Sequence, residues 1–231
     1  GMSVANVYYA QPLLDALARD FAISTAAVGG VVTATQTGCA LALLLLVPLG
    51  DMVERRKLML AQLTGLVAAL GLVSLSTSTP MLLCGMLAVG LLGTAMTQGL
   101  IASAASASDG QERGRVVGAA QGGVFIGLLL ARVFAGVVSD LAGWRAVYGA
   151  SAALMLVMLP LLWWRLPHVA RSREPIRWSA LIFSMLRLLL TDRVLQIRGV
   201  LALLMFAAFN IFWSAMVLPL SAPGYGFSHT V

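Results

Sequence analysis

Charged side chains gather in one short stretch of the sequence, between two of its most apolar segments. The stretch lies within PLGDMVERRKLML, and its charged residues are Asp51, Glu54, Arg55, Arg56 and Lys57. A carboxylate beside guanidinium groups accepts charge-assisted hydrogen bonds, which are about twice as strong as bonds between neutral groups. Asp51 can therefore accept such bonds from Arg55 or Arg56.

A second candidate for chemistry is Arg132, which lies inside a long apolar segment. A charged group in apolar surroundings is costly to keep unless it has a partner or a function. Two interpretations stay open. Arg132 contacts an anionic or polar substrate or biases the protonation of a neighbour, or its side chain extends outward to the polar interface.

Metal, cofactor and disulfide chemistry have little support in the sequence. The two histidines, His168 and His229, are far apart, and no metal-ligand spacing occurs. The two cysteines, Cys39 and Cys84, lie within apolar runs, which favours reduced thiols with a structural role. No phosphate-binding Gly-x-x-x-x-Gly-Lys loop is present. We expect neither a metal nor a cofactor, and no drive by ATP.

The composition indicates that lipid, rather than water, surrounds most of the chain. Of its 231 residues, 60% are hydrophobic and 10% are charged. Soluble domains are about 45–50% apolar and about 25% charged. The net charge of +6 does not predict nucleic-acid binding, because the charges fall in breaks between apolar runs rather than on one face.

The elements that must position these residues are apolar helices, because about 20 apolar residues are needed to cross a bilayer. The sequence predicts segments at residues 2–18, 26–49, 58–78, 81–105, 116–138, 146–164 and 199–220. The first is short and begins with polar residues, like the second half of a spanning helix. The predicted fold class is an all-α, polytopic membrane protein.

The placement of basic residues predicts the orientation of these segments. The loops at residues 50–57, 108–115 and 165–198 hold nearly all Lys and Arg, whereas the opposite loops hold only Arg19 and Arg145. Basic loops stay on the cytoplasmic side. We therefore expect an integral membrane protein with the three basic loops in the cytoplasm.

The segments predict three regions along the chain. Residues 1–165 would form an amino-terminal bundle of six helices, the first incomplete. Residues 166–197 would form a cytoplasmic linker with an interfacial amphipathic helix, since the apolar run from Trp178 to Leu190 is too short to span a bilayer. Residues 198–231 would contain the first helix of a truncated second bundle.

An internal repeat relates two charged stretches. Aligning VPLGDMVERR (residues 47–56) with GVVSDLAGWR (residues 136–145) places Asp51 on Asp140 and Arg56 on Arg145. The copies follow the second and the fifth predicted segments, so an odd number of segments separates them and they lie on opposite membrane faces. An inverted repeat of three plus three helices requires this arrangement.

The stretch PLGDMVERRK resembles the cytoplasmic loop motif G-x-L-x-D-R-x-G-R-R/K of the major facilitator superfamily. Leu49, Asp51, Arg55 and Arg56 match the motif, whereas Val47, Met52 and Glu54 depart from it. NVYYAQPLLDALA, ERGRVVG, GLLLAR and GWRAVY are further similar to bacterial efflux-type members, close to the drug:proton antiporter branch. The resemblance covers residues 4–220 and corresponds to the amino-terminal half, the linker and the seventh helix of that family.

This resemblance implies secondary transport of a small molecule across a bacterial inner (plasma) membrane, with export coupled to protons and alternating access between two bundles. It implies a missing carboxy-terminal bundle as a partner, and a conformational latch made by Asp51, Arg55 and Arg56, with Asp140 and Arg145 as its mirror. The helices that line the family's cavity point to Asn6, Tyr9, Gln11, Gln98, Asn210 and Trp213 as pathway residues. The family's common fourth-helix arginine would fall near Met86, where it is absent. Topology determination and ordinary helix packing remain alternative roles for all these residues.

Two other functions stay open. The chain would be a non-transporting membrane scaffold or a truncated remnant if no second bundle joins it. GWRAVYGASAAL resembles the active-site region of a rhomboid protease, with Ser151 after Gly149. That reaction needs a histidine within hydrogen-bond reach of the serine. Because His168 and His229 lie in predicted loops, we expect no enzyme activity.

Overall fold

A computed structural model describes the backbone of residues 1–106, 108, 111–165 and 178–220. It describes the side chains of these residues except 25, 26, 51, 179 and 209–220. The described part is helical and contains no strand. Its elements are α1 (Met2–Tyr8), α2 (Ala10–Asp20), α3 (Thr25–Leu41), η1 (Ala42–Leu46), η2 (Pro48–Asp51), α4 (Arg55–Ser74), α5 (Thr79–Ser106), α6 (Arg113–Ala142), α7 (Trp144–Arg165), α8 (Trp178–Thr191) and α9 (Arg193–Leu220).

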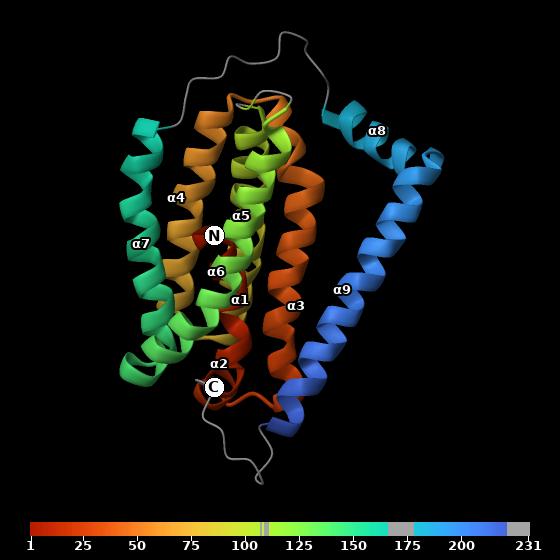
Figure 1. Cartoon of the computed structure of the whole chain (residues 1–231). Helices are drawn as coiled ribbons and strands as arrows, with labels where there is room; N and C mark the ends of the chain where they lie inside the picture. Colours follow the sequence, from red (N-terminus) through yellow and green to blue (C-terminus); the bar gives the residue numbers. More distant parts are fainter. Residues whose placement is uncertain (107, 109–110, 166–177, 221–231) are drawn as a thin grey trace. The chain divides into compact units, whose positions relative to one another are not determined.

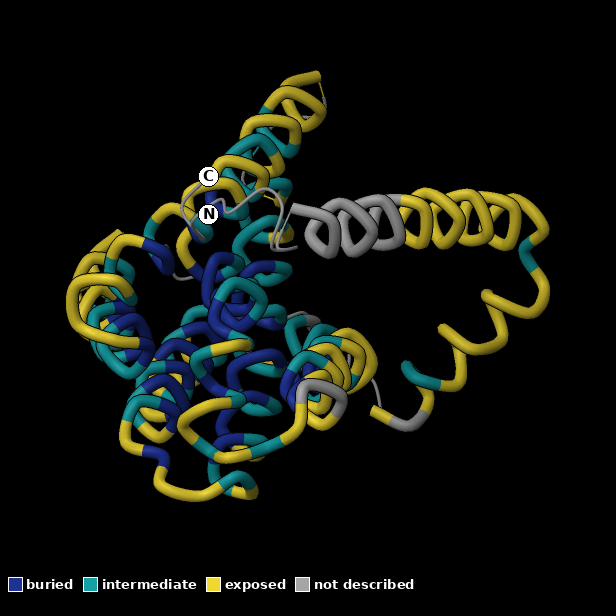
Figure 2. Tube along the Cα trace, turned by 90° about the horizontal axis from the view of Figure 1, so that it is seen from below, coloured by how far each residue is buried: buried dark blue, intermediate teal, exposed yellow. Residues whose placement is uncertain are grey.

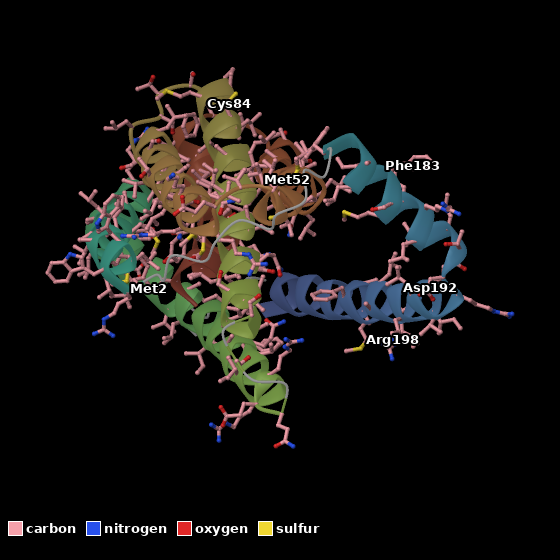
Figure 3. All side chains as sticks on the ribbon, turned by 90° about the horizontal axis from the view of Figure 1, so that it is seen from above. Met2, Met52, Cys84, Phe183, Asp192 and Arg198 are labelled. Carbon is pink, nitrogen blue, oxygen red and sulfur yellow. The ribbon has the colours of Figure 1, made fainter. Side chains whose placement is uncertain are left out.

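The chain divides into two compact units, Gly1–Pro175 and Ile176–Val231. The first unit is a helical bundle in which α5 packs against α3 and α4, α4 also packs against α7, and α1 contacts α5 and α6 (Figure 1). In the second unit, α8 and α9 meet at a corner. Figure 3 shows Phe183 on α8, Asp192 at this corner and Arg198 on α9.

Prolines set two of the breaks between helices. Pro12 has no N–H to donate to the carbonyl of Tyr8, and the helix of the first segment is interrupted at Tyr9. Pro48 likewise cannot donate to Leu44, and the helix before it widens into the π-helix η1 before the tight 3-10 helix η2 begins. The second segment therefore ends in an irregular turn that leads into Arg55.

Capping residues fix other helix ends. The Ser24 hydroxyl accepts a hydrogen bond from the Ala27 N–H at 3.2 Å, which caps α3. The Asp192 carboxylate accepts bonds from the N–H groups of Val194 and Leu195 at the start of α9. Between α6 and α7, Gly143 has a φ of 81°, a conformation in which glycine carries no steric penalty.

The middle of the first unit is tightly packed because glycines let two backbones approach closely. A Cβ atom at Gly90 of α5 would overlap the carbonyl oxygen of Thr35 on α3, and one at Gly38 would overlap the carbonyl oxygen of Leu87. Small residues at helix contacts replace the hydrophobic drive that lipid cannot supply. Large side chains fill the rest of this core, among them Leu17, Leu63, Leu66, Leu70, Leu82, Met86, Val89 and Tyr148.

Five helical stretches of the described part are long and apolar enough to cross a membrane: Ala27–Gly50, Arg55–Ser74, Thr79–Ser106, Arg113–Ala142 and Trp144–Arg165. Their buried residues face one another, whereas much of the surface of α6 and α7 is exposed (Figure 2). The exposed positions of α6 are apolar, among them Phe125, Leu129 and Val133. Such a surface suits contact with lipid or another apolar protein face.

The predicted segments correspond to the observed helices, with corrections at their ends. α6 continues through Asp140, and α7 begins at Trp144, so Arg145 lies in a helix rather than in a loop. Similarly, α9 begins at Arg193, six residues before the predicted start, and Arg198 is helical. Charged residues extend these helices because the ends of a spanning helix lie at the polar interface, where hydropathy no longer marks the helix.

The two ends of the first unit are formed by different helix ends. At one end, here called the Arg55 end, α4 and α6 begin and α5 and α7 finish, with Arg55, Arg56, Arg113, Arg115 and Arg165 (Figure 1). At the opposite end, called the Arg145 end, α2, α4 and α6 finish and α3, α5 and α7 begin. The two copies of the repeated stretch therefore lie at opposite ends of the bundle.

Candidate functional site

The charged turn at the Arg55 end is attached to α5 through Arg55. Its Nε donates to the carbonyl of Gly50 at 3.4 Å, and its Nη1 donates to the hydroxyl of Ser106 at 2.8 Å and to the carbonyl of Ala102 at 3.5 Å. One side chain thus joins the turn to the last turns of α5. The side chain of Asp51, the predicted latch carboxylate, lies outside the described residues.

The next arginine joins the same turn to α7. Nη2 of Arg56 donates to the carbonyl of Trp163 at 2.6 Å, and the guanidinium lies 4.9 Å from the centroid of the Trp163 ring. This distance allows a cation–π interaction. Lys57 forms an exposed ion pair with Glu54 at 2.8 Å. Arg55 and Arg56 therefore point from the start of α4 to two different helices.

At the Arg145 end, an ion pair joins residues distant in sequence. Nη1 of Arg145 donates to Oδ2 of Asp20 at 2.5 Å, and the indole Nε1 of Trp144 donates to the same oxygen at 3.2 Å. Nη2 of Arg145 donates to the carbonyl of Ser76 at 2.9 Å. Asp140 is exposed, and the structure does not bring it to Arg145. The carboxylate partner of Arg145 is thus Asp20, which the repeat did not indicate.

Two predicted pathway residues meet inside the bundle. Nη2 of Arg132, on α6, donates to Oε1 of Gln11, on α2, at 2.9 Å. Both residues are half-buried. Arg132 lies ten residues before Ala142, about 15 Å from the end of α6 at 1.5 Å per residue. The guanidinium is therefore held at the inner side of a membrane-spanning helix by an amide from another helix.

A second polar contact lies near this pair. The Ser151 hydroxyl, on α7, donates to Oδ1 of Asn6, on α1, and Nδ2 of Asn6 donates to the carbonyl of Met2 at 3.1 Å. Asn6 and Ser151 are both buried. Ser151 thus serves here as a hydrogen-bond partner between α7 and α1. His168 and His229 lie outside the described residues.

Aromatic rings surround these polar contacts. Tyr9 lies 5.5 Å from Phe134 and 6.3 Å from Tyr148, measured between ring centroids. Tyr148 is fully buried, and its hydroxyl has no hydrogen-bond partner among the described residues. The sequence prediction omitted Tyr148, although it precedes Ser151 by three positions and so shares its helix face.

The remaining predicted pathway residues do not join this cluster. Gln98, on α5, is half-buried and lines a cavity at the Arg55 end. The side chains of Asn210 and Trp213, on α9, lie outside the described residues. Within the described part there is no group of three or more metal-binding side chains, and Cys39 and Cys84 are free thiols.

This chain is similar in sequence to known proteins. The sequence model described as the Major Facilitator Superfamily matches residues 1–231. The uncharacterized transporter YgaY of Escherichia coli O157:H7 is 40% identical over 238 residues, covering 100% of this chain and 58% of that protein. "Probable transporter SCO4007" of Streptomyces coelicolor is 32% identical over 233 residues, covering 97% of this chain and 52% of that protein. The chain spans little more than half the length of these relatives.

A solved structure shares the fold. It is that of a bacterial homolog of the human lysosomal transporter Spinster, in an inward-facing and unoccupied conformation. It superimposes with a TM-score of 0.60 at 15% identity and covers 76% of this chain and 42% of that chain. Together with the apolar helices, this similarity confirms the predicted all-α, polytopic membrane fold.

Proposed function

Because the chain belongs to the Major Facilitator Superfamily, we propose that it acts, with a second helical bundle, in exporting a small molecule across the inner membrane in exchange for protons. Carriers of this kind expose a central site to one side and then to the other by rocking two bundles. Residues 1–165 would form one bundle, residues 166–197 a cytoplasmic linker, and residues 198–231 the start of the other. The proposal includes no enzyme activity.

The observation that carries this proposal is the contact between Arg132 and Gln11. A guanidinium at the centre of a membrane helix costs about 2.5–3.5 kcal/mol on insertion scales, so such groups commonly mark substrate or ion pathways. Arg132 is bonded to Gln11 from a different helix, and Asn6 and Tyr9 lie on the preceding turns of the same segment. We assign these residues to the substrate pathway.

The charged ends would control the change of access. We propose that Asp51, Arg55 and Arg56 form a cytoplasmic latch against the second bundle, and that Asp140 and Arg145 act at the opposite face. The support is the position of Arg55 and Arg56 at the end of the bundle, where a small shift of the turn changes bonds to both α5 and α7. Asn210 and Trp213 would complete the pathway from the seventh helix.

The experiment uses the full-length protein in proteoliposomes with an imposed pH gradient and a panel of cationic, neutral and anionic compounds. We expect substrate-dependent proton flux. Arg132→Gln should reduce it at least about tenfold, as the loss of a charge-assisted bond in low dielectric predicts. The matched control is Arg115→Gln, whose side chain is exposed and paired with Glu112 at the Arg55 end. Flux unaffected by Arg132→Gln would contradict the assignment.

The latch has a separate test in the same vesicles. Asp51→Asn should abolish transport while leaving membrane insertion unchanged, since an amide cannot replace the charged acceptor. Normal transport by this variant would leave Asp51 with a role in topology alone. If no compound in the panel drives flux in the unaltered protein, the second candidate, a non-transporting scaffold, gains support, because one bundle alone cannot enclose a pathway.

A further inference from the structure

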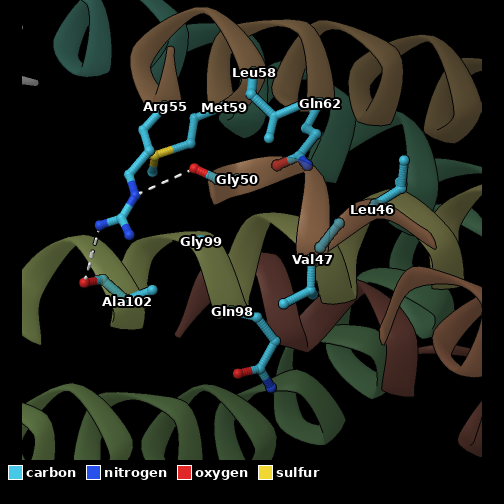
Figure 4. A pocket seen from close by; sticks show the side chains of 11 residues that line it. Leu46, Val47, Gly50, Arg55, Leu58, Met59, Gln62, Gln98, Gly99 and Ala102 are labelled. Atoms are coloured by element: carbon cyan, nitrogen blue, oxygen red, sulfur yellow. Dashed lines mark hydrogen bonds between the residues drawn. The ribbon is translucent and has the colours of Figure 1, made fainter. Parts of the chain in front are cut away.

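A cavity of about 140 Å³ lies at the Arg55 end of the first unit, between η1, η2, α4 and α5 (Figure 4). Most of its wall is apolar and comes from Leu46, Val47, Leu58, Met59 and Ala95. Its polar lining includes the guanidinium of Arg55, which extends from α4 toward Gly50 and Ala102, as Figure 4 shows. The cavity lies within one bundle, away from the contact of Arg132 with Gln11.

Gln62 places an unsatisfied polar group at this cavity. Its side chain lines the cavity, is only 4% exposed, and its Oε1 has no hydrogen-bond partner among the described residues. A buried acceptor without a partner costs about 1–3 kcal/mol. The amide of Gln98 points away from Gln62 in Figure 4, so it does not supply the missing bond.

The space beside the Gln62 amide is created by a glycine. A Cβ atom at Gly99 of α5 would lie 3.6 Å from Cγ of Met59 and 4.0 Å from Oε1 of Gln62. The wall of α5 is therefore open at the position that faces the unsatisfied oxygen. A side chain larger than glycine at this position would narrow the space beside the Gln62 oxygen.

We propose that this cavity is a binding site for a small cluster of water molecules held by Gln62 and Arg55. Water fits the chemistry because it can donate to the Gln62 oxygen and accept from the Arg55 guanidinium. A cavity holds water when it is roomy and offers polar partners, and each water molecule occupies about 30 Å³ in the liquid. The cavity has room for several waters, and its apolar walls would leave them few other partners.

These waters would make the charged turn easier to move. The bonds of Arg55 to Gly50 and Ala102 are 3.4 and 3.5 Å long, at the weak end of hydrogen-bond geometry, whereas its bond to Ser106 is 2.8 Å long. A neighbouring water can replace such a bond at little cost, because water-mediated bonds are nearly as favourable as direct ones. The waters therefore make it easier for the turn to move relative to α5. Their presence does not depend on the proposed transport function.

The test is X-ray hydroxyl-radical footprinting of the full-length protein in detergent. Radicals generated from bound water oxidise neighbouring methionines to the sulfoxide, even where bulk solvent has no access. Met59 lines the cavity and is 2% exposed, whereas Met86 and Met96 of α5 are equally buried but do not line it. We expect Met59 to be oxidised at least about fivefold faster than either control. Equal rates for the three methionines would overturn the proposal.

A variant tests whether Gln62 holds the water. Gln62→Leu keeps the size of the side chain and removes its amide, so the oxidation rate of Met59 should fall to that of Met96. The matched control is Thr97→Val on α5, which removes a buried hydroxyl that does not line the cavity and should leave the rate of Met59 unchanged. Unchanged oxidation of Met59 in Gln62→Leu would contradict the assigned role. If Gln62→Leu fails to fold, the ratio of rates in the unaltered protein decides.

Discussion

The two ends of the first unit differ in how their arginines are held. At the Arg145 end, one guanidinium binds a carboxylate from α2 and a carbonyl before α5, and the adjacent Trp144 binds the same carboxylate. At the Arg55 end, Arg55 and Arg56 bind backbone carbonyls and a serine, and a cavity lies beside them. The two aligned stretches therefore have different described partners, and the carboxylate that binds Arg145 is Asp20, which lies outside the alignment.

Helix α5 differs in packing along its length. Gly90 of α5 lies directly against the backbone of α3, whereas Gly99, nearer the Arg55 end, faces the cavity. Helix α5 is thus close-packed near its middle and open toward the Arg55 end. We infer that movements of the bundle are easier at the Arg55 end, where fewer packed atoms resist them.

The largest effect is expected at the close-packed contact. In Gly90→Ala, the new methyl group would overlap the carbonyl oxygen of Thr35, so α3 and α5 must separate. We expect a loss of about 3 kcal/mol in the free energy of unfolding, at the upper range for overpacking. Thermal unfolding in detergent, followed by circular dichroism, measures this loss.

The matched control for this variant lies on the same helix. In Gly99→Ala, the methyl group makes an ordinary contact, 3.6 Å from Cγ of Met59, and the higher helix propensity of alanine adds stability. Its melting temperature should equal or exceed that of the unaltered protein. A similar loss in both variants would remove the contrast between the two regions of α5.

A smaller effect is expected from the ion pair at the Arg145 end. Arg145→Met removes bonds to Asp20 and Ser76, and it leaves the carboxylate with the Trp144 indole. Because both charged side chains are partly exposed, we expect a loss of about 1–2 kcal/mol in unfolding free energy. Arg115→Met removes a more exposed pair with Glu112 and should cost less than about 0.5 kcal/mol. Equal losses would mean that the pairing with Asp20 adds nothing.

The smallest effect concerns the contact of Arg56 with Trp163. A double-mutant cycle with Arg56→Met and Trp163→Leu isolates this contact from the effects of each substitution alone. We expect a coupling free energy of about 0.5–1 kcal/mol, as for an exposed cation–π interaction. A coupling near zero would show that this contact does not stabilise the Arg55 end.

The helices could be predicted from the sequence because each long apolar run leads to one spanning helix. Their ends were less predictable, as Asp140 and Arg193 show, since charged residues at an interface continue a helix without adding hydropathy. The break before Arg55 follows from Pro48, which removes a backbone donor. The number and order of the helices thus depend on local properties that a single sequence contains.

The contacts of the candidate site could be predicted only in part. Arg132 was singled out by its charge within an apolar segment, and Gln11 by the family resemblance. In the sequence 121 positions separate them, and only the packing of α6 on α2 brings them together. Asp20 and Gln62 were not singled out, because a carboxylate at a helix end and an amide within an apolar run are both common. Asp20 is important because it binds Arg145 on another helix. Gln62 is important because its buried oxygen has no hydrogen-bond partner among the described residues.

The π-helix before Pro48 makes the chain tolerant of a loss of one residue at that position. A π turn accommodates one residue more than an α turn, and most occur as single-turn insertions. Removing one residue from Ala42–Leu46 would therefore restore regular α-helix and leave the preceding part of α3 in place, with Thr35 and Gly38 still against α5. Elsewhere in a regular helix, the loss of one residue would rotate the part before it by about 100° relative to the part after it.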